Sequence, residues 1–359
     1  MRYRSFMFNF NGVRKIRDQM SIKKFIVKLT LFLVITFFLQ SLLSFYLLRF
    51  ETSASRLNKY VFKFDEFVRL NNYLKAKTDI IYFGDSTIYT LGEGDKDERT
   101  TAGMVKDMTP CYSLGSITHA AYHMDLYLEF CRYITRQKNR PYFIIIPINM
   151  RSFSPEWDRR PQYQFEIEKI ILRGGLLKQL VLAFYKPLCV FKYNFSTISR
   201  KEFLNTPVFN GSQQMGMVRD FNNKSYLTYS ENNLKNSIIY FYMYTLNREH
   251  RKVKSMVEAA TILTQNNITA IFYITPIDHE TGEKYFPGQF LKRLRHNTQL
   301  ICSLLEAEGV EVLDLSIDLT SKYFRWVRYP NEYLRQTGRK YVAEKISHIL
   351  LNKEIDKRI

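Results

Sequence analysis

The sequence predicts an α/β domain with a parallel sheet, preceded by a single apolar N-terminal helix. Three observations support this prediction. Twenty consecutive residues near the N-terminus, 29–48, carry no charge. From about residue 76 onward, short apolar runs alternate with segments whose apolar residues recur at helical spacing. The short runs are almost continuously apolar, which is typical of strands buried on both faces of a parallel sheet.

The uncharged run at 29–48 is long enough to cross a membrane. Twenty helical residues reach about 30 Å, the thickness of the hydrocarbon layer. Eight Lys and Arg residues precede the run, and one acidic residue, Asp18, opposes them. This bias predicts a basic cytoplasmic tail over 1–28, an uncleaved anchor over 29–48 and an extracytoplasmic C-terminal part. A cleaved signal peptide is the alternative, although its apolar region is usually shorter.

Composition narrows the functional classes. The chain has 53 Lys and Arg against 34 Asp and Glu, a net charge of +19. We attribute this excess first to topology and to attraction by an anionic membrane surface, and not to nucleic-acid binding. The four cysteines form no Cys-x-x-Cys pair, and His119 and His123 lack a third ligand, so we predict no metal site. Cys111 and Cys131 could form a disulfide in an oxidising compartment.

The alternating part follows a regular order of strands and helices. We expect strands over 78–84, 110–115, 142–148, 268–275 and 310–315, and helices over 119–137, 251–264, 290–308 and 338–352. Residues 49–75 are then a stalk and 76–350 the domain. Residues 151–249 interrupt the alternation with aromatic and polar residues, so we interpret them as an insertion on the ligand face.

Polar residues follow several of the predicted strands, where parallel sheets bind their ligands. Gly84-Asp85-Ser86 follows the first strand directly, Asn149 follows the third, and His279 follows the fourth beside Asp278. Gly-Asp-Ser alone is a common turn and N-cap. Its place after the first strand favours a catalytic interpretation, in which Ser86 is a nucleophile that needs a base and an oxyanion cradle.

In the order and content of these blocks the sequence resembles the SGNH/GDSL hydrolase family, over roughly 76–350 without the insertion. The resemblance implies a flavodoxin-type three-layer fold and a nucleophilic Ser86. It further implies an oxyanion cradle from Asn149 and a backbone N–H near Gly115, with no metal or organic cofactor. Two positions depart from the family pattern: Tyr333 stands where the family has its catalytic His, and Pro330 where it has its Asp.

The missing imidazole leaves two interpretations open. An ordinary phenol is too weak a base at neutral pH, so the protein is either weakened or inactive, or another base has moved in. His279 is the candidate replacement because it follows the fourth strand beside an acid. Arg151 and Trp157, shortly after Asn149, are candidate substrate-binding residues, since cationic and aromatic groups suit a carbohydrate or an anionic polymer. A solvated loop with one packed tryptophan is the alternative.

Membrane-anchored proteins of this type are associated with acyl groups on cell-envelope polymers. The resemblance therefore implies a single-pass inner-membrane protein with an extracytoplasmic esterase or O-acyltransferase domain. It would act on envelope polysaccharide through an acyl-Ser86 intermediate, beside a polytopic membrane-bound O-acyltransferase. The alternative is a catalytically inactive module that binds glycan or scaffolds such an acyltransferase.

Overall fold

The computed structural model describes residues 11–49, 64–89, 95–158, 163–174, 231–326 and 330–358. The chain divides into two compact units. One contains helix α1 (Asn11–Arg49), and the other contains the α/β domain. Each unit is described by itself.

Helix α1 is continuous over 39 residues and includes the whole predicted anchor at 29–48. Its membrane-length apolar segment, Ile22–Leu42, has 21 residues, which corresponds to about 30 Å of helix. Large apolar side chains along it are exposed, among them Phe25 and Phe32. Within the described parts of the chain, this is the one helix long and apolar enough to span a membrane. The expectation of an N-terminal apolar helix is therefore confirmed.

The domain is built on one sheet of five parallel strands in the order β2-β1-β3-β4-β5. The strands are β1 (Ile80–Gly84), β2 (Leu114–Thr118), β3 (Phe143–Ile148), β4 (Thr269–Ile274) and β5 (Glu311–Asp314). The three central strands are almost fully buried, while β2 and β5 at the edges are partly exposed. The predicted α/β class with a parallel sheet is confirmed.

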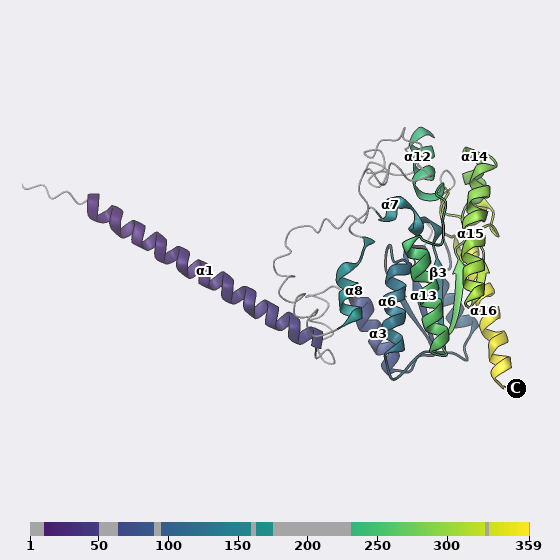
Figure 1. Ribbon diagram of the computed structural model, residues 1–359, viewed down its shortest axis with the longest axis horizontal. Coiled ribbons are helices and arrows are strands. Elements are labelled where there is room, and N and C mark those ends of the chain that lie inside the picture. Colours follow the sequence, from purple (N-terminus) through teal and green to yellow (C-terminus); the bar gives the residue numbers. More distant parts are fainter. Residues whose placement is uncertain are drawn as a thin grey trace, which may run out of the picture. The chain divides into compact units, whose positions relative to one another are not determined.

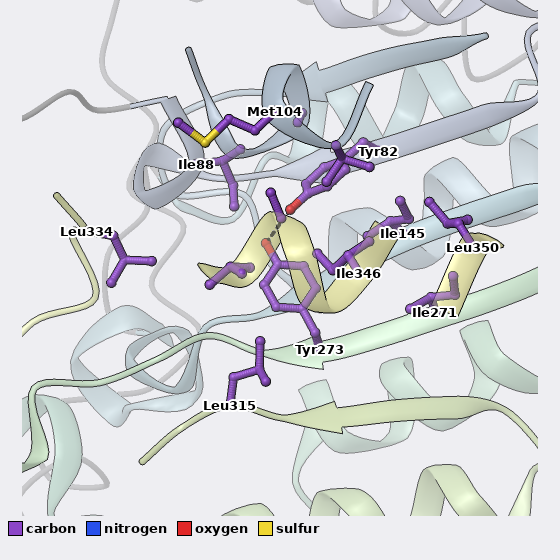
Figure 2. Close-up of a cluster of buried hydrophobic side chains, with 14 of the residues drawn as sticks. Tyr82, Ile88, Met104, Ile145, Ile271, Tyr273, Leu315, Leu334, Ile346 and Leu350 are labelled. Carbon is purple, nitrogen blue, oxygen red and sulfur yellow. Dashed lines mark hydrogen bonds between the residues drawn. The ribbon is translucent and has the colours of Figure 1, made fainter. Parts of the chain in front are cut away.

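Helices cover both faces of this sheet. On one face, alternate residues of the central strands pack against α5 (Thr101–Met108) and α16 (Gln336–Arg358). Figure 2 shows this cluster, in which the Tyr82 and Tyr273 hydroxyls form a buried hydrogen bond of 2.7 Å. On the other face, Phe83 stacks on Tyr127 of α6 (Met124–Thr135). Helix α13 (Arg251–Gln265) lies beside α6 (Figure 1).

Two remaining long helices complete the domain, α3 (Asp65–Lys75) next to β2 and α15 (Gln289–Ala307) next to β5. The predicted stalk at 49–75 is wrong at its C-terminal end, because the last eleven residues of that range form helix α3. Phe67, Leu70 and Leu74 are buried in it. Their spacing is that of an amphipathic helix, so the domain begins before residue 76.

Strand β2 also differs from the prediction. It begins at Leu114 and not at residue 110, and α6 begins at Met124 and not at 119. The sequence of this edge strand is not continuously apolar, because only alternate residues, Gly115 and Ile117, are buried. Cys111 and Cys131 are both free thiols, the first exposed and the second buried, so no disulfide joins them.

The predicted insertion, 151–249, is described over 151–158, 163–174 and 231–249. These parts contain η1 (Met150–Phe153), α7 (Pro155–Asp158), α8 (Glu166–Arg173) and α12 (Glu231–Tyr242), and no strand. They pack onto the domain, α8 against α6, and the N–H of Leu246 donates to Asn297 of α15 at 2.8 Å. The rest of the predicted insertion, 159–162 and 175–230, lies outside the described residues.

The sheet order fixes where a ligand site is expected. The chain passes from β1 outward to β2, and from β3 outward in the opposite direction to β4. In open parallel sheets, ligands bind where the order reverses, at the carboxyl ends of the two neighbouring strands. Ser86 follows β1 and Asn149 follows β3, so both lie at this switch point.

Candidate functional site

The Ser86 and Tyr333 hydroxyl groups meet at the switch point. Their oxygens are 3.0 Å apart, although the residues are 247 positions apart in the chain. Ser86 opens the short helix α4 (Ser86–Tyr89), and Tyr333 lies in the loop before α16. Both side chains are half-buried. Among the described residues, Tyr333 is the one hydrogen-bond partner of the Ser86 hydroxyl, and no histidine ring is bonded to it.

Asp85 and Asn149 tie the ends of β1 and β3 together. The Asn149 amide donates to Asp85 Oδ2 at 2.7 Å, and the Thr87 N–H and hydroxyl donate to Asp85 Oδ1. The side-chain oxygen of Asn149, Oδ1, accepts the Arg151 backbone N–H at 3.0 Å and caps η1. One of the two Asn149 N–H donors is therefore committed to Asp85. The second has no bonded partner among the described residues and remains available for an oxyanion.

The structure does not bring Gly115 to this site. Gly115 pairs with Ile81 inside the sheet, whereas the strand end is marked by the pairing of Gly84 with Thr118. Glycine at this position has a packing reason instead, because a Cβ would lie 2.6 Å from the ring of Tyr73 in α3. The predicted strand, 110–115, ended at Gly115, whereas β2 continues to Thr118, so Gly115 lies inside the strand and not after it.

His279 is on the expected edge of the sheet but makes no hydrogen bond to Ser86 or Tyr333. It is the first residue of α14 (His279–Tyr285), directly after the cap residue Asp278. Its Nδ1 is buried without a hydrogen-bond partner among the described residues. The Asp278 carboxylate accepts from Thr281 and Ser321, and burial raises the pKa of this carboxyl. The acid beside His279 is thus directed toward the cap of α14 and toward the short helix η5 (Ser321–Tyr323).

Arg151 joins the Ser86 and Tyr333 pair from η1. Its Nη2 donates to the Tyr333 hydroxyl at 3.3 Å. The guanidinium carbon lies 5.3 Å from the centre of the Tyr333 ring and 5.5 Å from the centre of the Trp157 ring, both distances typical of cation–π contacts. Arg151 is 6% exposed and Trp157 is also 6% exposed. The predicted substrate-binding pair therefore lies beside the serine, largely buried rather than on an open loop.

Two further residues of the site carried no motif in the sequence. Glu332 Oε2 is 3.6 Å from Arg151 Nη2, and burial raises the pKa of this carboxyl, opposed by the Arg151 charge. The Trp326 ring packs on the Tyr333 ring with centroids 4.6 Å apart. Proximity to Tyr333 along the chain was the one available signal for both. Pro330 is buried at the start of the same loop and supplies no acid.

Metal-binding and sequence comparisons complete the description of the site. In the described ranges, no group of three or more His, Cys, Asp or Glu residues could hold a metal ion. Of the two histidines after β2, His123 is bonded through Nε2 to the Tyr163 carbonyl oxygen at 2.6 Å. No protein-family model and no curated protein matches the chain.

Proposed function

We propose that this protein is a membrane-anchored acyl-transfer enzyme of the SGNH/GDSL type that uses Ser86 as its nucleophile. Its substrate is an acylated cell-envelope polysaccharide, and the acyl group passes to water or to a second glycan hydroxyl. The observation that supports this most is the Ser86–Tyr333 hydrogen bond of 3.0 Å at the switch point. A serine nucleophile needs a titratable partner at this distance, and ligands of parallel α/β sheets bind at this location.

The surroundings of Ser86 are consistent with the chemistry of acyl transfer. Attack of Oγ on an ester carbonyl places negative charge on the carbonyl oxygen, which backbone or amide N–H groups then stabilise. Asn149 has one N–H donor left for this purpose after its bond to Asp85. Arg151, packed against Trp157, places a cation beside the Ser86 and Tyr333 hydroxyls.

The N-terminal sequence supports a location at the inner membrane. Basic residues precede the apolar segment of α1, so the tail is cytoplasmic and the domain is extracytoplasmic in our proposal. This places the domain next to envelope glycans, and beside a polytopic membrane-bound O-acyltransferase as a partner. A periplasm-active reporter fused after Ile359 should give signal, and a reporter that works only in the cytoplasm should give none. The reverse result would overturn this orientation.

A second candidate function is a catalytically inactive module that binds glycan or scaffolds the acyltransferase. One observation favours it: a phenol, not an imidazole, is bonded to Ser86, and phenols normally hold their proton at neutral pH. In this case the Ser86 and Tyr333 hydroxyls serve as hydrogen-bonding groups for a bound ligand.

A fluorophosphonate probe separates the two candidates. The full chain in detergent is incubated with the probe across neutral and alkaline pH, and labelled protein is quantified on gels. The enzyme predicts labelling that Ser86→Ala abolishes, while the control Ser303→Ala, an exposed serine on α15, labels as wild type. Absence of Ser86-dependent labelling at every pH would contradict the enzyme and favour the binding module.

A further inference from the structure

We propose that Tyr333, with the Arg151 guanidinium beside it, is the general base that serves Ser86. Tyr333 is then a catalytic residue, and Arg151 is a positioning residue that acts through it. This inference rests on the proposed function, because it names the base for the same serine. It differs from the sequence expectation, which placed a relocated imidazole, His279, in this role.

The contacts place the Tyr333 hydroxyl between the serine and a cation. Its hydroxyl oxygen is 3.0 Å from Ser86 Oγ and 3.3 Å from Arg151 Nη2. A hydrogen bond from a cation to an oxygen is stronger when that oxygen carries negative charge, which is the form that a general base takes. The same oxygen touches the serine hydroxyl whose proton must leave. The phenol thus has both the position and the charged neighbour that a base requires.

Arg151 is held so that its charge stays at this place. Its guanidinium lies against the rings of both Trp157 and Tyr333, and its backbone N–H donates to Asn149 Oδ1 at 3.0 Å. It is 6% exposed, so little water screens its interaction with Tyr333. The rigid planar group loses less conformational freedom on forming this bond than a lysine would.

The nearby acids compete weakly for this cation. Glu332 lies 3.6 Å from Arg151, but burial raises the pKa of its carboxyl and favours the neutral form. Asp85, after β1, is bonded to Asn149 and Thr87. Asp278, from the loop after β4, is bonded to Thr281 and Ser321. Arg151 Nη2 is nearer to the Tyr333 oxygen, at 3.3 Å, than to Glu332 Oε2, at 3.6 Å.

Asn331 fixes the loop that presents Tyr333. Its Oδ1 accepts the Tyr333 N–H at 3.0 Å, and its Nδ2 donates to the Trp326 carbonyl oxygen at 3.0 Å. Its own carbonyl oxygen accepts the Asp278 N–H at 3.0 Å, which ties the loop to the end of β4. Asn331 is completely buried. The backbone of Tyr333 is therefore held by a buried side chain that is itself bonded to the segment after β4.

The proton moves between two oxygens in each half of the reaction. In the first half, the Ser86 proton passes to the Tyr333 phenolate while Oγ bonds to the ester carbonyl carbon. The alcohol leaves as the carbon–oxygen bond breaks and takes the proton from Tyr333. In the second half, water or a glycan hydroxyl gives its proton to the phenolate and attacks the acyl-Ser86 ester, and Ser86 regains the proton. No other reactant is required.

The test is the pH profile of fluorophosphonate labelling in the full chain. Labelling by wild type should rise through the alkaline range, because phenols ionise there. Tyr333→Phe should lower labelling at least a hundredfold, the lower end of what general-base catalysis contributes, about 10²–10⁴-fold. Tyr333→His should move the rise toward neutral pH, near about 6.5 for an ordinary imidazole. Arg151→Gln should move it to more alkaline pH, and Arg151→Lys should partly restore it.

Matched controls keep the result specific. Tyr341 lies on α16, and Tyr341→Phe removes its hydroxyl, which is bonded to Asp318. Arg293→Gln removes a guanidinium that is bonded to Thr245. Both should label as wild type, and near-ultraviolet circular dichroism should show that every variant is folded. Ser86-dependent labelling that is unchanged in Tyr333→Phe, or lost in His279→Ala, would overturn the assignment of the base but leave Ser86 as the nucleophile. No Ser86-dependent labelling at any pH would overturn both proposals.

Discussion

The paired hydroxyls of Tyr82 and Tyr273 allow a sharp test of the structure of the core. Both side chains are essentially unexposed and come from β1 and β4, the two strands that flank β3. Each hydroxyl has the other as its hydrogen-bond partner at 2.7 Å (Figure 2). Burial raises the pKa of Tyr82, so its hydroxyl stays protonated throughout the neutral range. Tyr82→Phe removes one hydroxyl and leaves the other buried without a partner.

The expected loss of stability differs between single and double variants. An unsatisfied buried hydroxyl costs about 1–3 kcal/mol, whereas replacing both partners by apolar groups of the same shape is nearly neutral. We expect Tyr82→Phe and Tyr273→Phe each to lower the free energy of unfolding by about 1–3 kcal/mol. The double variant should lie within about 1 kcal/mol of wild type, well short of the sum of the two single losses.

Thermal and urea unfolding of the full chain in detergent measure these losses, with near-ultraviolet circular dichroism as the signal. Each kcal/mol should lower Tm by about 2–4 °C for a domain of this size. Tyr142→Phe is the surface control, because Tyr142 is 59% exposed, and such changes usually stay within about 0.5 kcal/mol. A double variant that loses the sum of the two single losses would refute the reasoning, since the hydroxyls would then be stabilised independently.

Three other predictions concern the fold and its charges. Gly115→Ala should destabilise by about 1–3 kcal/mol, because the new Cβ meets the Tyr73 ring; stability equal to wild type in urea unfolding would contradict this packing. Burial lowers the pKa of His123 to about 3, so the unfolded chain binds the extra proton between pH 6.5 and 3. Stability should be complete above pH 6.5 and fall by about 1.4 kcal/mol per pH unit below it, and His123→Gln should flatten this slope. Arg339→Met should cost about 3–5 kcal/mol, because it leaves the Asp95 carboxylate buried without its cation; adding Asp95→Asn should recover part of this loss.

The sequence predicted the three central strands better than the edge strand β2, for a physical reason. Strands β1, β3 and β4 are buried on both faces, so nearly every position favours an apolar residue and the strands form continuous apolar runs in the sequence. Strand β2 lies at the edge with half-buried residues, and its range was misplaced by four residues at its start. Helix α3 was missed, although Phe67, Leu70 and Leu74 are spaced as an amphipathic helix requires.

The site was predictable where it depends on strand order. Ser86, Asn149 and Tyr333 follow from the order of blocks along the chain, and the structure brings Ser86 and Tyr333 into hydrogen-bond contact. The bond from Arg151 to Tyr333 was not predictable, because a guanidinium can reach many groups, and only tertiary packing selects one. Glu332 had no pattern at all, since a buried acid is recognised by its surroundings and not by its spacing.

The interactions that hold the site are separate from those that would do chemistry in it. Asp85 and Asn149 join β1 to β3, and Asn331 fixes the loop of Tyr333, without any contact between these bonds and the Ser86 hydroxyl. The geometry would therefore persist whether position 333 holds a strong base, a weak base or none. In our proposal, the charge of Arg151 beside Tyr333 decides between catalysis and binding. Because the bonds that hold the site do not involve the proposed base, we expect its replacement to leave the geometry unchanged. A pH profile, and not a further structure, would therefore distinguish an enzyme from a binding module.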